Sequence, residues 1–198
     1  LKTLLDICGV QNRPNVYHIG YLLGPRINAG GRVGKSTHGA NLLINKNPKD
    51  VFKLASELDI FNKERQLLEK EVHDKILFEI GNKIHDPVII IDGKNWHEGV
   101  IGIVASRIKD KFNKPVIIIT ISDEGVGKAS ARSVVGFDIG SAIISAAHEK
   151  ILIKGGGHKM AGGFSIAVEN IEKFKNFIFK RYKKKNIESS MIKSLYLD

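Results

Sequence analysis

The residues in this sequence that are best suited to chemistry lie in ILIKGGGHKMAGGFSI, residues 151–166, which hold five glycines beside a histidine. Each glycine costs backbone entropy on folding, so a tight turn, a close backbone contact or a bound ligand should offset that cost. Gly155, Gly156 and Gly157 can adopt positive φ and expose backbone N–H groups to an anion, and His158 adds a donor beside them. The segment is therefore predicted to bind a phosphate or nucleotide, with a structural turn as the alternative. Its spacing matches neither a Walker loop nor a dinucleotide fingerprint.

Small and polar residues alternate in a second candidate segment, residues 127–133. In a β-strand, the period of two places Lys128, Ser130 and Arg132 on one face. Burying such a face is costly unless an anion compensates its charge. A phosphate or carboxylate partner is therefore predicted, and a solvated face is the alternative.

A third candidate is GPRINAGGR, residues 24–32, which proline and glycine predict to be a loop. It places Arg26, Asn28 and Arg32 on a glycine-rich frame. The planar guanidinium of arginine matches the geometry of a phosphate group. Phosphate binding is one interpretation of this loop, and a surface turn with solvated arginines is the other.

The remaining polar residues give little sign of catalytic chemistry. His97 precedes an expected helix and is a cap-region residue, a ligand contact or a packed core histidine. The sequence has no His-x-x-x-His pair, no cysteine cluster and no Asp-x-Asp pair near a histidine, so it predicts no metal site. It therefore supplies anion-binding groups more clearly than catalytic ones.

Composition sets broad limits on function. The 198 residues carry 31 Lys and Arg against 21 Asp and Glu, so the net charge is 31 − 21 = +10. That balance favours polyanionic partners such as nucleic acid, although a solvated lysine-rich surface explains it equally well. Cys8 is the only cysteine, which predicts a reducing compartment such as the cytoplasm. No apolar run is long enough to span a bilayer, and the start at Leu1 predicts a piece of a longer protein.

Hydrophobic spacing predicts a compact first part, a long helix and an α/β part. Asn47 and Pro48 are an N-cap and first helical residue, and apolar residues three or four apart continue to Ile80, with a break near Asp59 as an alternative. Further along, expected strands alternate with expected helices, which predicts an α/β domain. The strands are expected at residues 87–92, 115–121, 128–134 and 163–168, and the helices at residues 99–112, 138–149 and 169–184.

Four segments, residues 23–32, 96–107, 130–133 and 155–163, together resemble the RecJ-type single-strand-specific exonucleases of the DHH phosphoesterase superfamily. The glycine-rich motif is shared with other members that carry a DHHA1 domain, whereas Trp96–Gly99 and the loop at residues 24–32 are more specific to RecJ-type members. The resemblance covers nearly the whole chain. It implies an α/β fold in which a DHHA1-type domain, a mixed sheet flanked by helices, follows a long connecting helix and the end of a DHH domain. The implied parts are residues 1–46 for the DHH end, 47–85 for the connecting helix, 86–185 for the DHHA1 substrate-binding domain and 186–198 for a tail.

The resemblance also implies an activity, 5′-to-3′ hydrolysis of single-stranded DNA to mononucleotides in DNA repair and recombination, with Mn²⁺ or Mg²⁺ as cofactor. The metal-binding aspartate and histidine motifs of the family lie upstream of Leu1, so this chain is expected to bind DNA and to need the missing DHH domain for catalysis. The implied catalytic residues facing the cleft are Arg26, Asn28 and Arg32. The implied substrate-binding residues are His97, Ser130, Arg132, Gly155, Gly156, Gly157 and His158.

Two alternatives stay open at this point. One is a phosphodiesterase of the same superfamily that acts on short oligoribonucleotides or cyclic dinucleotides. The other is a non-catalytic nucleic-acid-binding remnant. Neither is separated from the exonuclease interpretation by composition or spacing alone.

Overall fold

The computed structural model describes residues 1–184, which form two compact units. The first unit is Leu1–Lys70 and the second begins at Glu71. One long helix, α4 (Pro48–Glu79), contributes residues to both units. The tail expected at residues 186–198 lies outside the described residues. Within the described chain, no helix combines the length and apolar character that crossing a membrane requires.

The first unit packs short helices against the N-terminal part of α4. Its core consists of five buried apolar side chains from four helical elements, namely Leu4, Leu23, Leu42, Ala55 and Leu58. The elements that precede α4 are α1 (Lys2–Ile7), the π-helical turn η1 (His18–Leu23), α2 (Gly24–Val33) and α3 (His38–Ile44).

The loop predicted at residues 24–32 is wrong, because this segment is helix α2. Pro25 occupies the first turn, where the missing N–H of proline costs no hydrogen bond. Gly30 is needed for packing, since a Cβ there would lie 2.7 Å from the carbonyl oxygen of Lys35. Proline and glycine therefore mark a helix start and a close contact in this segment.

Helix α4 confirms the predicted N-cap, because the Asn47 side-chain oxygen accepts a hydrogen bond from the Lys49 N–H at 3.0 Å. The helix continues through Asp59, so the alternative of a break there is wrong. The Asp59 carboxylate is held at 2.8 Å by both Arg26 Nε and Lys63 Nζ. Arg26 and Asp59 are 16% and 11% exposed, so the pair fixes α2 against α4 away from bulk water.

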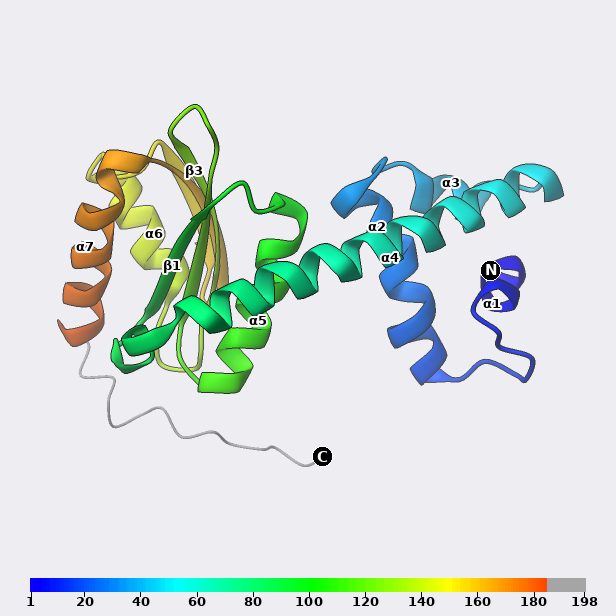
Figure 1. The fold of residues 1–198 in the computed structure, drawn as a ribbon, viewed down its shortest axis with the longest axis horizontal. Helices are drawn as coiled ribbons and strands as arrows, with labels where there is room; N and C mark the ends of the chain where they lie inside the picture. The colour runs from blue at the N-terminus through cyan, green and yellow to red at the C-terminus, as the bar shows by residue number, and fades with distance from the viewer. Residues whose placement is uncertain (185–198) are drawn as a thin grey trace. The chain divides into compact units, whose positions relative to one another are not determined.

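The second unit is a five-stranded mixed sheet with the order β1-β2-β3-β5-β4. Only β1 and β2 pair in parallel, and the other neighbours are antiparallel. Helix α5 covers one face, while α6 and α7 cover the other (Figure 1). The strands are β1 (Ile89–Lys94), β2 (Val116–Ile121), β3 (Val126–Arg132), β4 (Lys154–His158) and β5 (Ala161–Ala167), and the helices are α5 (Glu98–Phe112), α6 (Ile139–His148) and α7 (Ile171–Lys184). Two short 3₁₀ turns, η2 (Gly81–His85) and η3 (Val168–Asn170), complete the unit.

The main core lies between the sheet and the helices α6 and α7. Phe174 of α7 is fully buried against Phe164 of β5, with ring centroids 4.6 Å apart. Ile143 and Ala146 of α6 fill the same layer. Burying this apolar layer is the dominant favourable contribution to the fold of the second unit. The mixed α/β architecture expected from the sequence is confirmed.

The sequence analysis missed strand β4, which is formed by the glycine run itself. The expectation that Gly155, Gly156 and Gly157 take positive φ is wrong, since none of them lies in the left-handed region. They pair in antiparallel register with β5, Gly156 opposite Gly163 and Gly157 opposite Gly162. The turn of this hairpin is the Lys159–Met160 pair that follows the glycines.

The glycines permit α6 to approach the hairpin closely. A Cβ at Gly140, in the first turn of α6, would lie 2.7 Å from both the backbone nitrogen and the carbonyl oxygen of His158. Cβ atoms at Gly155 and Gly162 would lie 2.8 and 2.6 Å from side-chain carbons of Ile143. Close backbone contact therefore offsets the entropy cost of these glycines.

We predict that Gly140→Ala destabilises the protein by about 1–3 kcal/mol, because its methyl group would overlap backbone atoms that cannot move aside. Gly156→Ala is the matched control, since a Cβ there meets no atom within 4 Å. Urea unfolding of both variants measures the difference. Equal stability of Gly140→Ala and the parent chain would contradict this packing.

We further predict that Asp59→Asn lowers the free energy of unfolding at neutral pH by about 1.5–3 kcal/mol, the range for hydrogen bonds to charged groups. Burial alone raises the pKa of Asp59, but hydrogen bonds from Lys63 and Arg26 outweigh it and hold that pKa below its ordinary value. The carboxylate thus stabilises the fold above the pKa of the unfolded state, and this contribution is lost as the pH falls through the lower pKa of the folded state.

Urea unfolding at several pH values measures this effect. The difference between the parent chain and Asp59→Asn should shrink as the pH falls below about 4. Asp6→Asn, at an exposed carboxylate of the same unit, is the control and should show a small effect throughout. A difference that does not change with pH would show that the charge of Asp59 is not the cause.

Candidate functional site

The start of helix α5 is held in place by the segment that precedes it. Trp96 is buried, and its carbonyl oxygen accepts a hydrogen bond from Thr120 Oγ1 of β2 at 2.8 Å. Its ring lies over Gly93, where a Cβ would come within 2.2 Å of the indole. His97 is the N-cap of α5, and its Nδ1 accepts the Gly99 N–H at 3.1 Å. These contacts fix α5 over one face of the sheet.

Strand register places three rows of residues on that same face, across β3, β5 and β4. The first row is Arg132, Ala161 and His158; the second is Ser130, Gly163 and Gly156; the third is Lys128, Ser165 and Lys154. The period of two predicted Lys128, Ser130 and Arg132 on one face, and the register confirms it. The hairpin adds a further histidine and lysine to that face.

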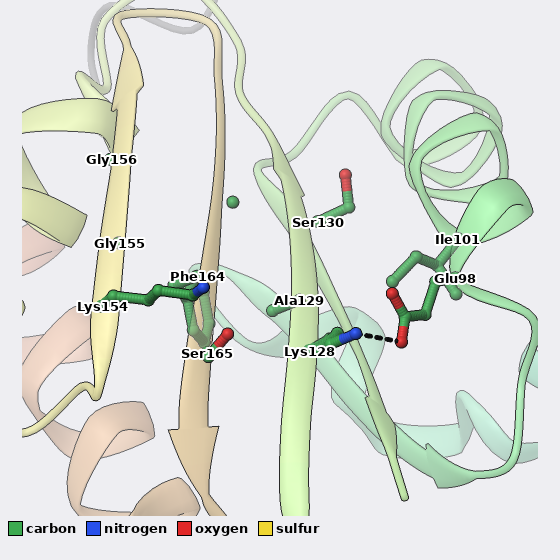
Figure 2. A pocket seen from close by; sticks show the side chains of 11 residues that line it. Glu98, Ile101, Lys128, Ala129, Ser130, Lys154, Gly155, Gly156, Phe164 and Ser165 are labelled. Carbon is green, nitrogen blue, oxygen red and sulfur yellow. Dashed lines mark ion pairs between the residues drawn. The ribbon is translucent and has the colours of Figure 1, made fainter. Parts of the chain in front are cut away.

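Beside α5 these strands form an open groove of about 560 Å³. Glu98 and Ile101 of α5 form one wall, and residues of β4 form the other (Figure 2). The floor is made by β3 and β5, with Ser130 on one side and Phe164 and Ser165 in the middle. Of the predicted substrate-binding residues, Ser130, Gly155 and Gly156 line this groove.

Gly156 and Gly163 leave one strip of the groove surface without side chains. No atom lies within 4 Å of a Cβ placed on Gly156, and Gly163 beside it is exposed. The same hairpin is closely packed on its other face, where Gly155 and Gly162 meet Ile143. A flat, open strip of backbone can accept a planar or extended ligand that any larger side chain would block.

Ser130 and Arg132 form a local pair at one end of the groove. Arg132 Nη1 donates to Ser130 Oγ at 3.0 Å and to the Ala131 carbonyl oxygen at 2.8 Å. Gly102 of α5 faces this pair, because a Cβ there would lie 2.9 Å from both Ser130 Oγ and Arg132 Nη2. The missing side chain at Gly102 therefore makes room for the guanidinium under the helix.

Lys128 supplies a second cation and has a carboxylate partner. Its Nζ lies 2.6 Å from Glu98 Oε1, and both side chains are 56% exposed. The sequence predicted a phosphate or carboxylate partner for this strand face, and the structure provides a carboxylate from α5. Glu98, Lys154 and Ser165 were missed as groove residues, because only the pairing of β4 with β5 and the position of α5 bring them here.

The two predicted histidines lie outside the residues that line the groove. His97 serves as the cap of α5, which is one of the roles left open by the sequence. His158 is exposed at the end of β4, where its Nδ1 accepts the Met160 N–H at 3.4 Å. Its register places it in the same row as Arg132. Gly157 is exposed beside His158 in β4. A Cβ there would lie 2.5 Å from the carbonyl oxygen of Ala161 on the paired strand β5.

The predicted catalytic residues of the first unit lie on two sides of α2. Asn28 and Arg32 are exposed and one turn apart, so they share a helix face. Arg26 instead points inward, pairs with Asp59 and donates from Nη1 to the Leu22 carbonyl oxygen at 2.9 Å. The contacts of Arg26 are therefore those of a residue that stabilises the fold.

The described residues do not fit a metal ion. Between residues 1 and 184, no three side chains of histidine, cysteine, aspartate or glutamate come close enough together to hold one. The groove has a single carboxylate, Glu98, which is already paired with Lys128. Its other polar groups are lysines and serines, which suit anions far better than cations.

Comparison with known proteins places this site in a family. Residues 71–184 match the model of the DHHA1 domain. The single-stranded-DNA-specific exonuclease RecJ of Salmonella typhimurium is 35% identical over 182 residues, which cover 88% of this chain and 32% of the relative. The protein of the same name from Bacillus subtilis is 33% identical over 174 residues, covering 86% of this chain and 22% of the relative. The chain thus spans roughly a quarter to a third of these relatives.

Solved structures agree with the sequence relatives. A crystal structure of RecJ from Thermus thermophilus in complex with Mg²⁺ superposes with a TM-score of 0.79 at 28% identity, covering 92% of this chain and 28% of that one. A second structure, of exonuclease RecJ bound to manganese, gives 0.79 at 28% identity and covers 95% of this chain and 47% of that one. The chain therefore belongs to the DHHA1 domain family and is homologous over most of its length to the RecJ single-stranded-DNA-specific exonucleases.

Proposed function

We propose that this chain is the substrate-holding part of a RecJ-like exonuclease that degrades single-stranded DNA from the 5′ end in DNA repair and recombination. One observation carries the proposal: an open groove that combines a strip of backbone without side chains, at Gly156 and Gly163, with Ser130, Lys128 and Lys154. Arg132 lies at the end of this groove. The homology to RecJ exonucleases selects single-stranded DNA among the polyanions that such a groove suits.

The groove matches the physical demands of a single strand. Lysine and arginine neutralise phosphates and release counterions, which supplies most of the sequence-independent affinity. The strip at Gly156 and Gly163 gives the sugar–phosphate chain a close approach to the backbone. In this arrangement Arg132 and Ser130 hold one phosphate near the 5′ end, as a bidentate guanidinium and a hydroxyl donor.

Metal-dependent cleavage is assigned to the part of the protein that this chain lacks. RecJ structures have been solved with Mg²⁺ and with Mn²⁺, whereas residues 1–184 hold no group of side chains suited to either ion. We propose that a DHH domain outside this chain supplies the ligands and packs on the first unit. Exposed apolar side chains at the start of η1 support such a partner, because Tyr17, its N-cap, and Ile19 and Tyr21 within it are each more than half exposed.

We predict that Arg132→Ala weakens binding of 5′-phosphorylated single-stranded DNA and lowers the salt slope of log K by about 0.7 units, because one phosphate contact with a single strand is lost. Fluorescence anisotropy across a range of salt concentrations measures both quantities. Arg181→Ala, on α7 at the opposite face of the sheet, is the charge-matched control. If Arg132→Ala binds with the affinity and slope of the control, this role of Arg132 is wrong.

We also predict that the purified chain binds single-stranded DNA weakly but does not hydrolyse it. Incubation with Mn²⁺ and a 5′-phosphorylated oligonucleotide should release no mononucleotides, since the metal ligands are missing. A longer protein that includes a DHH domain should release them under the same conditions. Robust release by the 198-residue chain would overturn the division of labour proposed above.

A further inference from the structure

We infer that Gly102 of α5 is a positioning residue for the 5′-terminal phosphate, because its lack of a side chain leaves room for Ser130 and Arg132 to stand together as a phosphate-binding pair. The inference rests on the proposed function, in which this pair holds a phosphate near the 5′ end. Gly102 acts through Arg132 and does not itself contact the strand. It therefore determines a selectivity, the preference of the chain for 5′-phosphorylated over 5′-hydroxyl strands.

A side chain at position 102 would meet the phosphate-binding groups themselves. A Cβ built there lies 2.9 Å from Ser130 Oγ and 2.9 Å from Arg132 Nη2, which is closer than a side-chain carbon can approach them. Both atoms are the tips of polar side chains, and neither belongs to the backbone. Gly140 differs, since a Cβ there would meet the backbone of His158. The fold can therefore accept a methyl group at position 102, provided that the pair moves.

The backbones on both sides of this contact are held in place. Val104 and Ile108 of α5 are fully buried, so the helix cannot retreat without opening the core. Strand β3 is paired on both sides, with β2 and with β5. The Arg132 side chain is only partly buried and can change its rotamer. A methyl group at position 102 should therefore displace the guanidinium and leave the helix and the strand where they are.

The guanidinium is useful to a phosphate only in its present position. Arg132 Nη1 is held at 3.0 Å from Ser130 Oγ and at 2.8 Å from the Ala131 carbonyl oxygen, to both of which it donates. Since Ser130 Oγ accepts this bond, its own proton can be donated to a phosphate oxygen. A pair that is already assembled binds a phosphate without a further ordering cost. Displacing the guanidinium removes this advantage and one charge-assisted hydrogen bond with it.

The test compares the 198-residue chain with Gly102→Ala, using one thymidine oligonucleotide, labelled at its 3′ end, with either a 5′-phosphate or a 5′-hydroxyl. Fluorescence anisotropy gives the two dissociation constants, and their ratio is the preference for the phosphorylated strand. Gly102→Ala should lower this preference about tenfold, as expected for one lost hydrogen bond to a charged group. Its affinity for the 5′-hydroxyl strand should stay close to that of the parent chain.

Two further comparisons separate positioning from folding. In an Arg132→Ala background, Gly102→Ala should have little further effect on the preference, because residues that act through one another are not additive. Gly140→Ala is the opposite case, since its methyl group would meet backbone atoms. It should lose stability in urea unfolding and keep the preference, whereas Gly102→Ala should unfold near the midpoint of the parent chain and lose the preference.

Three results would overturn the inference: Gly102→Ala keeps the full preference, it loses as much stability as Gly140→Ala, or its effect is the same with and without the Arg132 side chain. If Arg132→Ala abolishes the preference and Gly102→Ala does not, the role of Gly102 alone fails. If the parent chain binds both strands equally, or binds neither, the proposed role of Ser130 and Arg132 fails, and the role of Gly102 fails with it.

Discussion

The structure of the second unit depends on how closely helix α6 approaches the β4–β5 hairpin. Gly140 places the first turn of α6 against the backbone of His158, and Ile143 fills the space over Gly155 and Gly162. Larger residues at these positions would push the helix away from the sheet and open the core beneath it. Because β-strand residues alternate between faces, Gly156 and Gly163 meet the open side of the hairpin. The hairpin therefore packs against the core with one face and lines the groove with the other.

Most elements of the fold could be predicted from sequence, because apolar periodicity follows directly from which faces are buried. The strands at β1 and β2 and the helices α4 to α7 are examples, each within a few residues of its observed bounds. The two errors involve glycine. In β4 and α2, glycine marks close packing inside a regular element, whereas local rules associate it with turns and loops. Such contacts depend on tertiary neighbours, which a single sequence does not display.

Some residues of the candidate site could likewise be predicted from sequence, and others could not. The face that carries Lys128, Ser130 and Arg132 was predictable, since it requires only the period of one strand. Lys154 was not, because it reaches the groove through the unexpected strand β4. Glu98 lies in the groove because the hydrogen bond between Thr120 and the Trp96 carbonyl oxygen holds the start of α5 beside the sheet. These two residues lie far apart in the sequence. Residues whose place in the groove depends on the packing of two elements were therefore not predicted from sequence, whereas residues that share one strand were.

The Arg26–Asp59 and Lys128–Glu98 ion pairs differ in how far their side chains are exposed to solvent. Arg26 and Asp59 are largely buried, so breaking their contact would leave charges in a poorly solvated environment, and the pair stays closed to support the helices. Lys128 and Glu98 make an equally short contact, yet water solvates each of them when the contact opens. An anion from solution can therefore compete with Glu98 for Lys128, whereas an anion competing for Arg26 would have to displace a carboxylate that is also held by Lys63. The buried pair thus fixes the position of Arg26 between two helices, whereas the exposed pair leaves Lys128 accessible to solvent.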